Sequence, residues 1–223
     1  MLKNLIIILC IIFLGGHPLF PTAEYFLLTD VGSSAEMIGI GNIEGFSKSS
    51  NSVFENPASL YRVDNYSTSF FTTTFMGEVV YSNVSAAYNT PWGVVAAGYM
   101  STGVSGIPFT GEDRFGEFFV ISFFNYTNAL GKIAYQMTPA ENFYVGAAGT
   151  WYQNEIADVT GTGYNIDAGM FYVLDELELS VFARNLITAS KATYNNGGEE
   201  IFPLQVLYGL KYNYHWTQLH VQL

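Results

Sequence analysis

Hydrophobic and polar residues alternate with a period of two along much of the chain beyond residue 65, and this period is typical of β-strands with two different faces. The alternation is clearest in the segments 129–138, 164–172, 177–184 and 204–214. One face of each segment is apolar or aromatic, and the opposite faces together carry five charged residues: Lys132, Asp167, Glu178, Arg184 and Lys211. The pattern therefore predicts an all-β protein whose strands each have one apolar face.

Eight segments have the length expected of membrane strands. A tilted strand needs about 9–11 residues to cross a bilayer, and the eight segments are 66–75, 79–88, 93–101, 129–138, 143–152, 163–172, 177–184 and 204–214. The tail 215–223 is a candidate for the start of another strand. Tyr and Trp recur near the segment ends, as in the aromatic girdles of membrane barrels. We therefore expect an antiparallel transmembrane β-barrel, and a soluble β-sandwich, which also alternates, is the alternative.

The connections between these segments alternate between short and long, as in outer-membrane barrels with short periplasmic turns and longer outer loops. We expect short turns at 89–93, 138–142 and 174–176, and long loops at 101–116, 153–162 and 185–203. The segment 117–137 is too long for a single strand. We therefore place 117–126 partly in an extracellular β extension that continues into the membrane strand.

The N-terminus has the pattern of a secretory signal peptide over residues 1–23. Lys3 gives a basic start, 5–14 is an apolar run, and cleavage is expected after Ala23. This run has about ten residues whereas a spanning helix needs about 20, so we prefer a signal peptide to a transmembrane anchor. Residues 24–62 are rich in glycine and small residues and lack strand alternation. We expect them to form an N-terminal hatch or plug, followed by the barrel over residues 63–223.

The composition favours an exported membrane protein over other classes. Charged residues make up 12% of the 223 residues, where an ordinary soluble domain has about 25%. The net charge is −11 and the basic residues are scattered, which argues against a nucleic-acid partner. The single cysteine, Cys10, lies in the predicted signal peptide. We therefore expect neither disulfides nor thiolate metal sites in the exported chain.

No arrangement of residues predicts catalysis. The histidines are His17, His215 and His220, so none lies between residues 18 and 214, which argues against a Ser-His-Asp triad and a histidine metal site. We expect a non-enzymatic protein without a cofactor. The five charged residues of the polar faces are expected to line the lumen, because Lys or Arg facing lipid costs about 2–4 kcal/mol at the bilayer midplane. Solubility of the lumen explains them, and a lining that guides a ligand is the alternative.

Several short motifs occur in a fixed order along residues 30–214. They are the glycine-rich Gly32-Ser-Ser-Ala-Glu-Met-Ile-Gly-Ile-Gly41, then Ser52-Val-Phe-Glu-Asn-Pro-Ala-Ser-Leu60, then Asn89-Thr-Pro-Trp-Gly93, Tyr164-Asn-Ile-Asp-Ala-Gly-Met-Phe-Tyr172, Ala183-Arg-Asn-Leu186, Phe202-Pro-Leu-Gln205 and Gly209-Leu-Lys-Tyr212. Together they resemble the PorV/PorQ-like outer-membrane proteins of the FadL superfamily, with Ser59 in place of the family's usual glycine. The resemblance implies a bacterial outer-membrane barrel of about fourteen strands with a hatch that includes Asn56, Pro57 and Ala58.

The same resemblance implies passage of hydrophobic small molecules, such as long-chain fatty acids, across the outer membrane, with outer-membrane lipid and that ligand as partners. The alternative that it implies is a non-enzymatic component of type IX protein secretion, which binds cargo or partner proteins. The eight or nine strands expected here are fewer than the family's, and Leu223 is not the aromatic residue usual at its C-terminus. We therefore expect a C-terminally truncated sequence.

Overall fold

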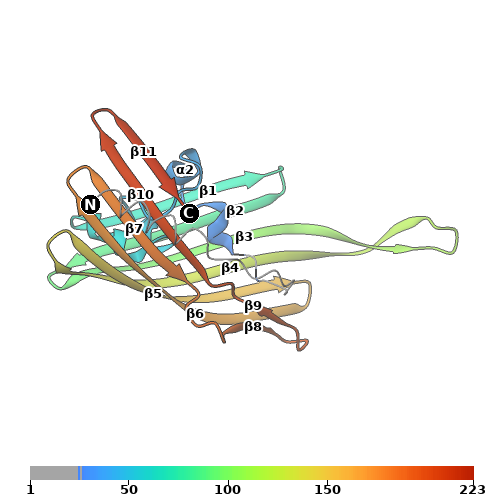
Figure 1. The fold of residues 1–223 in the computed structure, drawn as a ribbon. Helices are drawn as coiled ribbons and strands as arrows, with labels where there is room; N and C mark the ends of the chain where they lie inside the picture. Colours follow the sequence, from blue (N-terminus) through green and yellow to red (C-terminus); the bar gives the residue numbers. More distant parts are fainter. Residues whose placement is uncertain (1–24, 26) are drawn as a thin grey trace.

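The computed structural model describes Tyr25 and residues 27–223, so the predicted signal peptide lies outside the described residues. This part of the protein is all-β and forms one antiparallel sheet of 11 strands (Figure 1). Its main path runs through nine strands in sequence order, namely β1 (Tyr66–Phe75), β2 (Val79–Thr90), β3 (Gly93–Glu112), β4 (Phe118–Ala140), β5 (Phe143–Ile156), β6 (Val159–Leu174), β7 (Leu177–Arg184), β10 (Gln205–Tyr214) and β11 (Thr217–Gln222).

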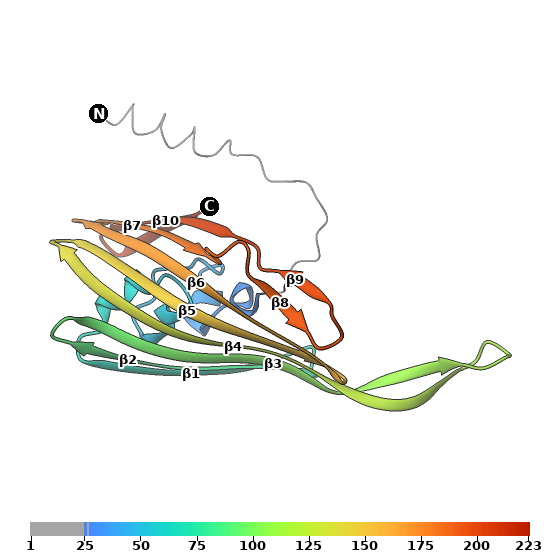
Figure 2. The ribbon, with the colours of Figure 1, turned by 90° about the horizontal axis from the view of Figure 1, so that it is seen from below.

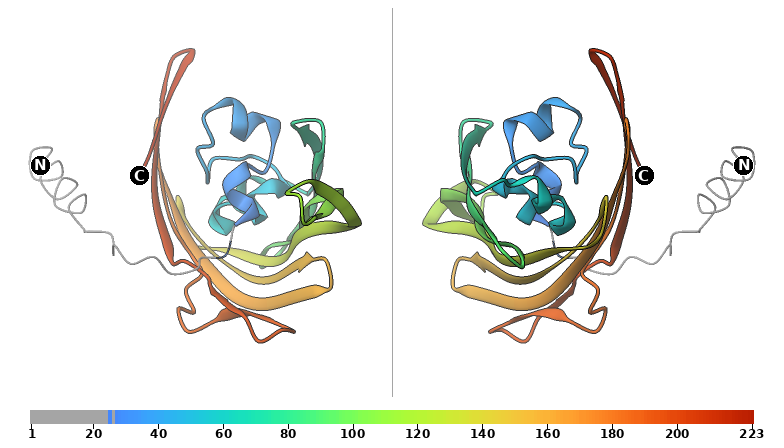
Figure 3. Two further views of the ribbon diagram at one scale, coloured as in Figure 1. Left: turned by 90° about the vertical axis from the view of Figure 1, so that its right-hand side faces the viewer. Right: turned by 90° about the vertical axis from the view of Figure 1, so that its left-hand side faces the viewer.

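The sheet is strongly curved but is not closed on itself. β1 and β11 are the two ends of the strand path, and the end-on views show the strands curving around the residues before β1 (Figure 3). We call the side that faces these residues the concave face and the opposite side the convex face. The structure is therefore all-β and antiparallel, as predicted, but its sheet is not closed into a barrel.

Each of the eight predicted strands is present, and residues of the tail form β11. Of the three predicted long loops, 101–116 and 153–162 are wrong, whereas 185–203 does connect β7 to β10 but contains two short strands. β3 continues to Glu112, only two residues separate β5 from β6, and 185–203 contains β8 (Lys191–Tyr194) and β9 (Glu199–Ile201), of which β8 pairs with β6. Beyond Thr102, β3 has no buried side chain, so its residues show no alternation and resemble a loop.

The hairpin of β3 and β4 is the largest of these differences. β4 is one strand of 23 residues, so the expectation that this segment is too long for one strand is wrong, whereas its expected β extension is present. The neighbouring strands stop at the pairs Val80–Gly103 and Tyr126–Ile156. Residues 105–125 therefore project beyond the sheet as a two-stranded hairpin, which we call the arm (Figure 2).

Residues 27–63, which we call the N-terminal segment, contain no strand and lie against the concave face (Figure 3). Their helical turns are η1 (Leu28–Val31), α2 (Ala35–Gly39), η2 (Ser50–Val53) and η3 (Pro57–Arg62). Phe54 and Leu60 are fully buried in the main apolar core, which also holds Met100 and Leu130 of the sheet. Among the described residues, no helix is both long enough and apolar enough to cross a membrane.

The convex face of the sheet exposes large apolar side chains, whereas the concave face buries polar and charged residues beside the apolar residues of the core. On the convex face of β6, Tyr164, Ile166 and Met170 are 67%, 45% and 49% exposed. On the concave face of the same strand, Asn165 and Asp167 are buried. A strand presents alternate side chains to opposite faces, so the period-two pattern turns one apolar row outwards and places the polar and charged residues inwards, where apolar core residues also lie.

Candidate functional site

The contact between the N-terminal segment and the concave face is the candidate functional site, and Asn56 lies near its centre. The side chain of Asn56 is completely buried. Its Nδ2 group donates to Ser180 Oγ at 2.9 Å and to the Met170 carbonyl oxygen at 3.1 Å, while its Oδ1 accepts from the Ala58 amide at 2.9 Å. Asn56 therefore caps η3, which begins at Pro57, and ties the segment to β6 and β7.

Two glycines of the sheet allow this close approach. A Cβ atom added at Gly146 would lie 2.5 Å from the Pro57 carbonyl carbon, and one added at Gly169 would overlap the Asn56 side chain. Both glycines lie on the concave face of their strands, β5 and β6. The Asn56-Pro57 backbone is therefore packed against a part of the wall that has no side chains on that side.

Arg184 of β7 is the main electrostatic contact of the site. Its guanidinium is buried and forms ion pairs with Glu44, in very close contact, and with Asp30 at 3.5 Å. It also donates to the Phe54 carbonyl oxygen at 3.3 Å. Burial raises the pKa of the Asp30 carboxyl, and the Arg184 charge opposes this shift. One sheet cation thus holds three residues of the N-terminal segment.

A second charged group surrounds Glu178 of β7. Its carboxylate forms ion pairs with Arg62 of the N-terminal segment, in close contact, and with Lys211 of β10 at 3.4 Å. Asn213 donates to the same carboxylate at 3.2 Å. The Arg62 guanidinium also lies over the ring of Phe171, 4.5 Å from its centroid. This cluster fixes the end of η3 to β7 and β10.

The third charged pair lies within the sheet. Lys132 Nζ of β4 is 2.6 Å from Asp167 Oδ2 of β6, and both side chains are almost fully buried. The Asp167 carboxylate also accepts from the Thr150 hydroxyl at 3.1 Å and from the Asn185 amide at 3.0 Å. The pair is well satisfied by hydrogen bonds, as a buried ion pair must be.

Glu55 is a buried acid of a different kind. It accepts from the Ser33 hydroxyl at 2.7 Å and from the Gly45 amide at 2.9 Å. None of the ion pairs that the described residues form includes Glu55. Burial therefore raises the pKa of its carboxyl above the ordinary value, and the two hydrogen bonds oppose that shift.

The structure thus places the five predicted lumen residues on the concave face, together with the Asn56-Pro57-Ala58 motif. All five are ion-paired, and they are covered rather than open to a ligand in this state. Sequence reasoning missed Asp30, Glu44 and Arg62, which supply ion-pair partners from the N-terminal segment, and it also missed the buried Glu55. The available signal was their position: they are charged residues in a stretch otherwise dominated by small and apolar residues.

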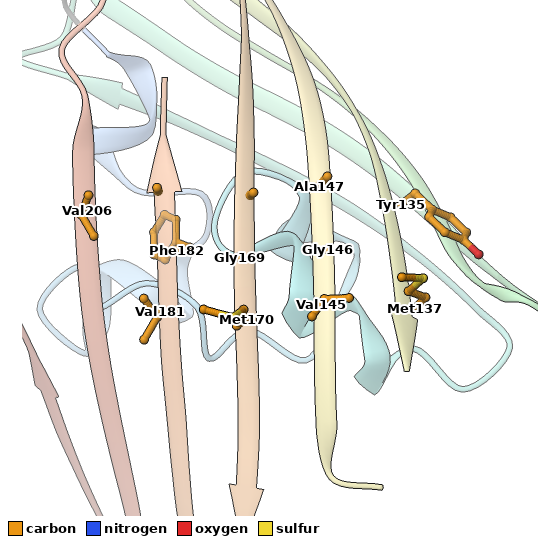
Figure 4. Close-up of a pocket in the computed structure, with 12 residues that line it drawn as sticks. Tyr135, Met137, Val145, Gly146, Ala147, Gly169, Met170, Val181, Phe182 and Val206 are labelled. Atoms are coloured by element: carbon orange, nitrogen blue, oxygen red, sulfur yellow. The ribbon is translucent and has the colours of Figure 1, made fainter. Parts of the chain in front are cut away.

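The convex face carries a second feature, an apolar groove of about 480 Å³ across β4, β5, β6, β7 and β10 (Figure 4). Ala147, Ala168 and Ala183 lie along it, with Met137 and Met170 beside them. The N-terminal segment lies on the other side of the same strands, where Gly146 and Gly169 contact it. At these two glycines only the backbone of the sheet separates the groove on the convex face from the N-terminal segment on the concave face.

In the part of the chain that the structure describes, no group of three or more His, Cys, Asp or Glu side chains could hold a metal ion. His215 lies in the turn between β10 and β11, and His220 packs edge-on against Phe46 with 5.4 Å between ring centroids. What the arrangement can do is hold a short segment across the concave face by paired charges.

Comparison with known proteins adds no family to this description. Neither a protein-family model nor a curated protein matches the chain.

Proposed function

We propose that the protein is an outer-membrane β-barrel protein in which the curved sheet is part of the wall and the N-terminal segment is the hatch. In this proposal it passes hydrophobic small molecules, such as long-chain fatty acids, across the outer membrane. The observation that carries the proposal is the polarity of the sheet. Exposed apolar side chains lie on the convex face, and buried ion pairs lie on the concave face beneath the N-terminal segment.

The exposed apolar surface is the first support. It includes large side chains from all parts of the sheet, such as Phe70, Val84, Tyr99, Ile133, Ile166 and Leu219. Soluble monomers rarely expose contiguous apolar patches of more than a few hundred Å². Lipid is the solvent that favours such a surface, and it is also the solvent that drives charged groups to the opposite face.

The spacing of aromatic residues is the second support. Tyr164 and Tyr172 lie on the convex face of β6, eight residues apart, which corresponds to about 27 Å along the strand at about 3.4 Å per residue. A tilt of about 40° reduces this to about 21 Å across the membrane, close to the apolar band of about 25 Å in outer-membrane barrels. Tyr99, Trp151 and Tyr164 also follow one row of paired positions across β3 to β6.

In lipid, the edges of β1 and β11 need further strands as partners, because each unpaired backbone group there costs several kcal/mol. The barrel of about fourteen strands that the family resemblance implies would meet this need.

Passage of a ligand then requires the N-terminal segment to move. A direct test is to fix it to the wall through Ser50 and Ser85, whose hydroxyl oxygens are 2.8 Å apart. The double variant S50C/S85C brings two thiols together, and Cys10 of the predicted signal peptide is the only natural cysteine. We expect oxidation of the double variant to abolish uptake of radiolabelled oleate by a bacterial host that lacks its own long-chain fatty acid transporter.

A reductant should restore that uptake, and the single variant S50C should be insensitive to oxidation. Oxidised S50C/S85C that carries oleate as fast as the unmodified protein would show that the N-terminal segment is not a hatch on the route.

A second candidate function, binding of cargo or partner proteins in type IX secretion, is favoured by the arm. Seven of its large apolar residues are exposed: Phe109, Phe115, Phe118, Phe119, Val120, Ile121 and Phe123. An isolated two-stranded hairpin is only marginally stable in water, and an exposed aromatic surface of this kind is typical of interaction sites. Because the arm projects beyond the sheet, such a site would lie outside the membrane.

To separate the two functions, the arm can be removed by replacing residues 105–125 with Asn-Gly. Asn-Gly is a two-residue turn that suits a hairpin, and it would connect Val104 to Tyr126, which are directly paired in the sheet. In the native host, the secretion role predicts loss of secreted cargo from the medium with oleate uptake intact. Unchanged secretion would exclude this role for the arm.

A further inference from the structure

The groove on the convex face is built from a row of small side chains. Ala147, Ala168 and Ala183 occupy directly paired positions on β5, β6 and β7. The same row begins at Tyr135 of β4 and ends at Val206 of β10. Since alanine extends only one carbon from the wall, the row forms the floor of a groove between larger neighbours.

The wall of the groove is the adjacent row of paired positions. It consists of Met137, Val145, Met170 and Val181, all of which line the groove (Figure 4). These side chains contribute only carbon and sulfur. The hydroxyl of Tyr135, the polar side-chain atom at the end of the row, already donates to the Trp92 carbonyl oxygen at 2.7 Å. A ligand in the groove would therefore meet no free hydrogen-bonding side chain, which excludes a polar headgroup as its occupant.

The length of the groove matches one leaflet of a bilayer. Five strands at a spacing of about 4.8 Å give a row of about 19 Å from Tyr135 to Val206. Strands tilted by about 40° incline this row by the same angle to the membrane plane, so it rises by about 12 Å through the bilayer. One leaflet of the hydrocarbon core is about 15 Å deep.

From these features we propose that the groove binds one acyl chain of an outer-membrane phospholipid in a fixed position on the barrel wall. The inference rests on the proposed membrane location of the convex face. An acyl chain is the occupant that fits because it is apolar along its whole length and lies in one leaflet. A second copy of the protein would instead cover the groove from outside and would link two chains.

The test uses the full chain reconstituted into vesicles of palmitoyl-oleoyl phosphatidylethanolamine, followed by mild detergent extraction and native mass spectrometry. Ala168→Leu fills the middle of the floor, and Ala86→Leu adds the same carbons at an exposed alanine of the convex face on β2, outside the groove. Both positions point away from the core, so both variants should fold and insert like the unmodified protein.

We expect the unmodified protein and Ala86→Leu to retain one phospholipid per chain. Ala168→Leu should reduce the lipid-bound fraction by at least about tenfold, because its added carbons occupy the space in which the chain packs. Equal retention by all three inserted proteins overturns the groove proposal and leaves the proposed function intact. A lipid-free dimer that Ala168→Leu dissociates also overturns it, in favour of a second copy. Failure of the unmodified protein to insert would overturn both.

Discussion

Replacement of Arg184 by methionine is the most informative single perturbation of the hatch contact. Methionine keeps much of the side-chain volume but removes the charge that pairs with Glu44 and Asp30. The Arg184 and Glu44 side chains are both almost fully buried, whereas that of Asp30 is about half exposed. Among the ion pairs that the described residues form, Glu44 pairs with Arg184 alone. The substitution therefore leaves one buried carboxylate without its partner.

Breaking one side of a buried ion pair costs about 3–5 kcal/mol, chiefly because the remaining charge is uncompensated. At about 1.4 kcal/mol for each tenfold change, the population in which the N-terminal segment has left the wall should rise by roughly two to four orders of magnitude. Arg184→Met combined with Glu44→Gln should recover most of this loss, because a neutral pair in a buried site avoids the uncompensated charge.

Hydrogen exchange in vesicles measures this population directly. The amides of Phe54 and Ser59 are bonded within the N-terminal segment, and their exchange should accelerate in Arg184→Met while the amides of β3 to β5 stay protected. Lys191→Met is the matched control, because the Lys191–Glu199 pair is exposed and such pairs contribute at most about 1 kcal/mol. If Arg184→Met exchanges no faster than Lys191→Met, the claim that this ion pair holds the segment is wrong.

Three further substitutions test other contacts of the segment. Because burial raises the pKa of Glu55 above 4.5, the Glu55 contribution to docking is largest below that pH and is lost as the pH rises through the raised value; Glu55→Gln should remove this contribution to the pH dependence and increase protection at pH 7. Gly146→Ala places a Cβ against Pro57, whereas the Cβ of Gly149→Ala on the same strand meets nothing within 4 Å. Limited proteolysis should therefore cleave the N-terminal segment faster in Gly146→Ala and at an unchanged rate in Gly149→Ala. Asn56→Ala removes two hydrogen bonds to the wall and should cost about 2–4 kcal/mol of docking free energy. This cost can be measured from the hydrogen-exchange protection of the segment at increasing urea concentrations, and a loss below about 0.5 kcal/mol would contradict the role of Asn56.

The strands and their faces could be read from the sequence because a half-buried strand imposes a period of two. β6, for example, has apolar residues at the even, outward positions of 164–172, and its odd, inward positions include the polar Asn165 and Asp167. The arm could not be read in the same way, because its β4 residues 118–123 are exposed on both faces. Without a buried face there is no selection for alternation, so a long strand resembles a loop.

The candidate site was only partly predictable for a different reason. The charged residues of the sheet stand out because a period-two strand places them opposite apolar residues. Their partners do not, since Glu44 lies 140 residues before Arg184 and Arg62 lies 116 residues before Glu178. Such pairing depends on the path of the N-terminal segment through the concavity, and no local pattern specifies that path.

The central claim, that the convex face lies in lipid, is tested most directly by spin labels placed singly at 162–172 of β6 in vesicles. Collision rates with oxygen, which concentrates in lipid, and with a water-soluble nickel complex would be measured at each position. The proposed location predicts high oxygen and low nickel access at the even positions, and low access to both reagents at the odd positions beneath the N-terminal segment. High nickel access at Ile166 and Met170 would place the convex face in water and contradict the proposed function.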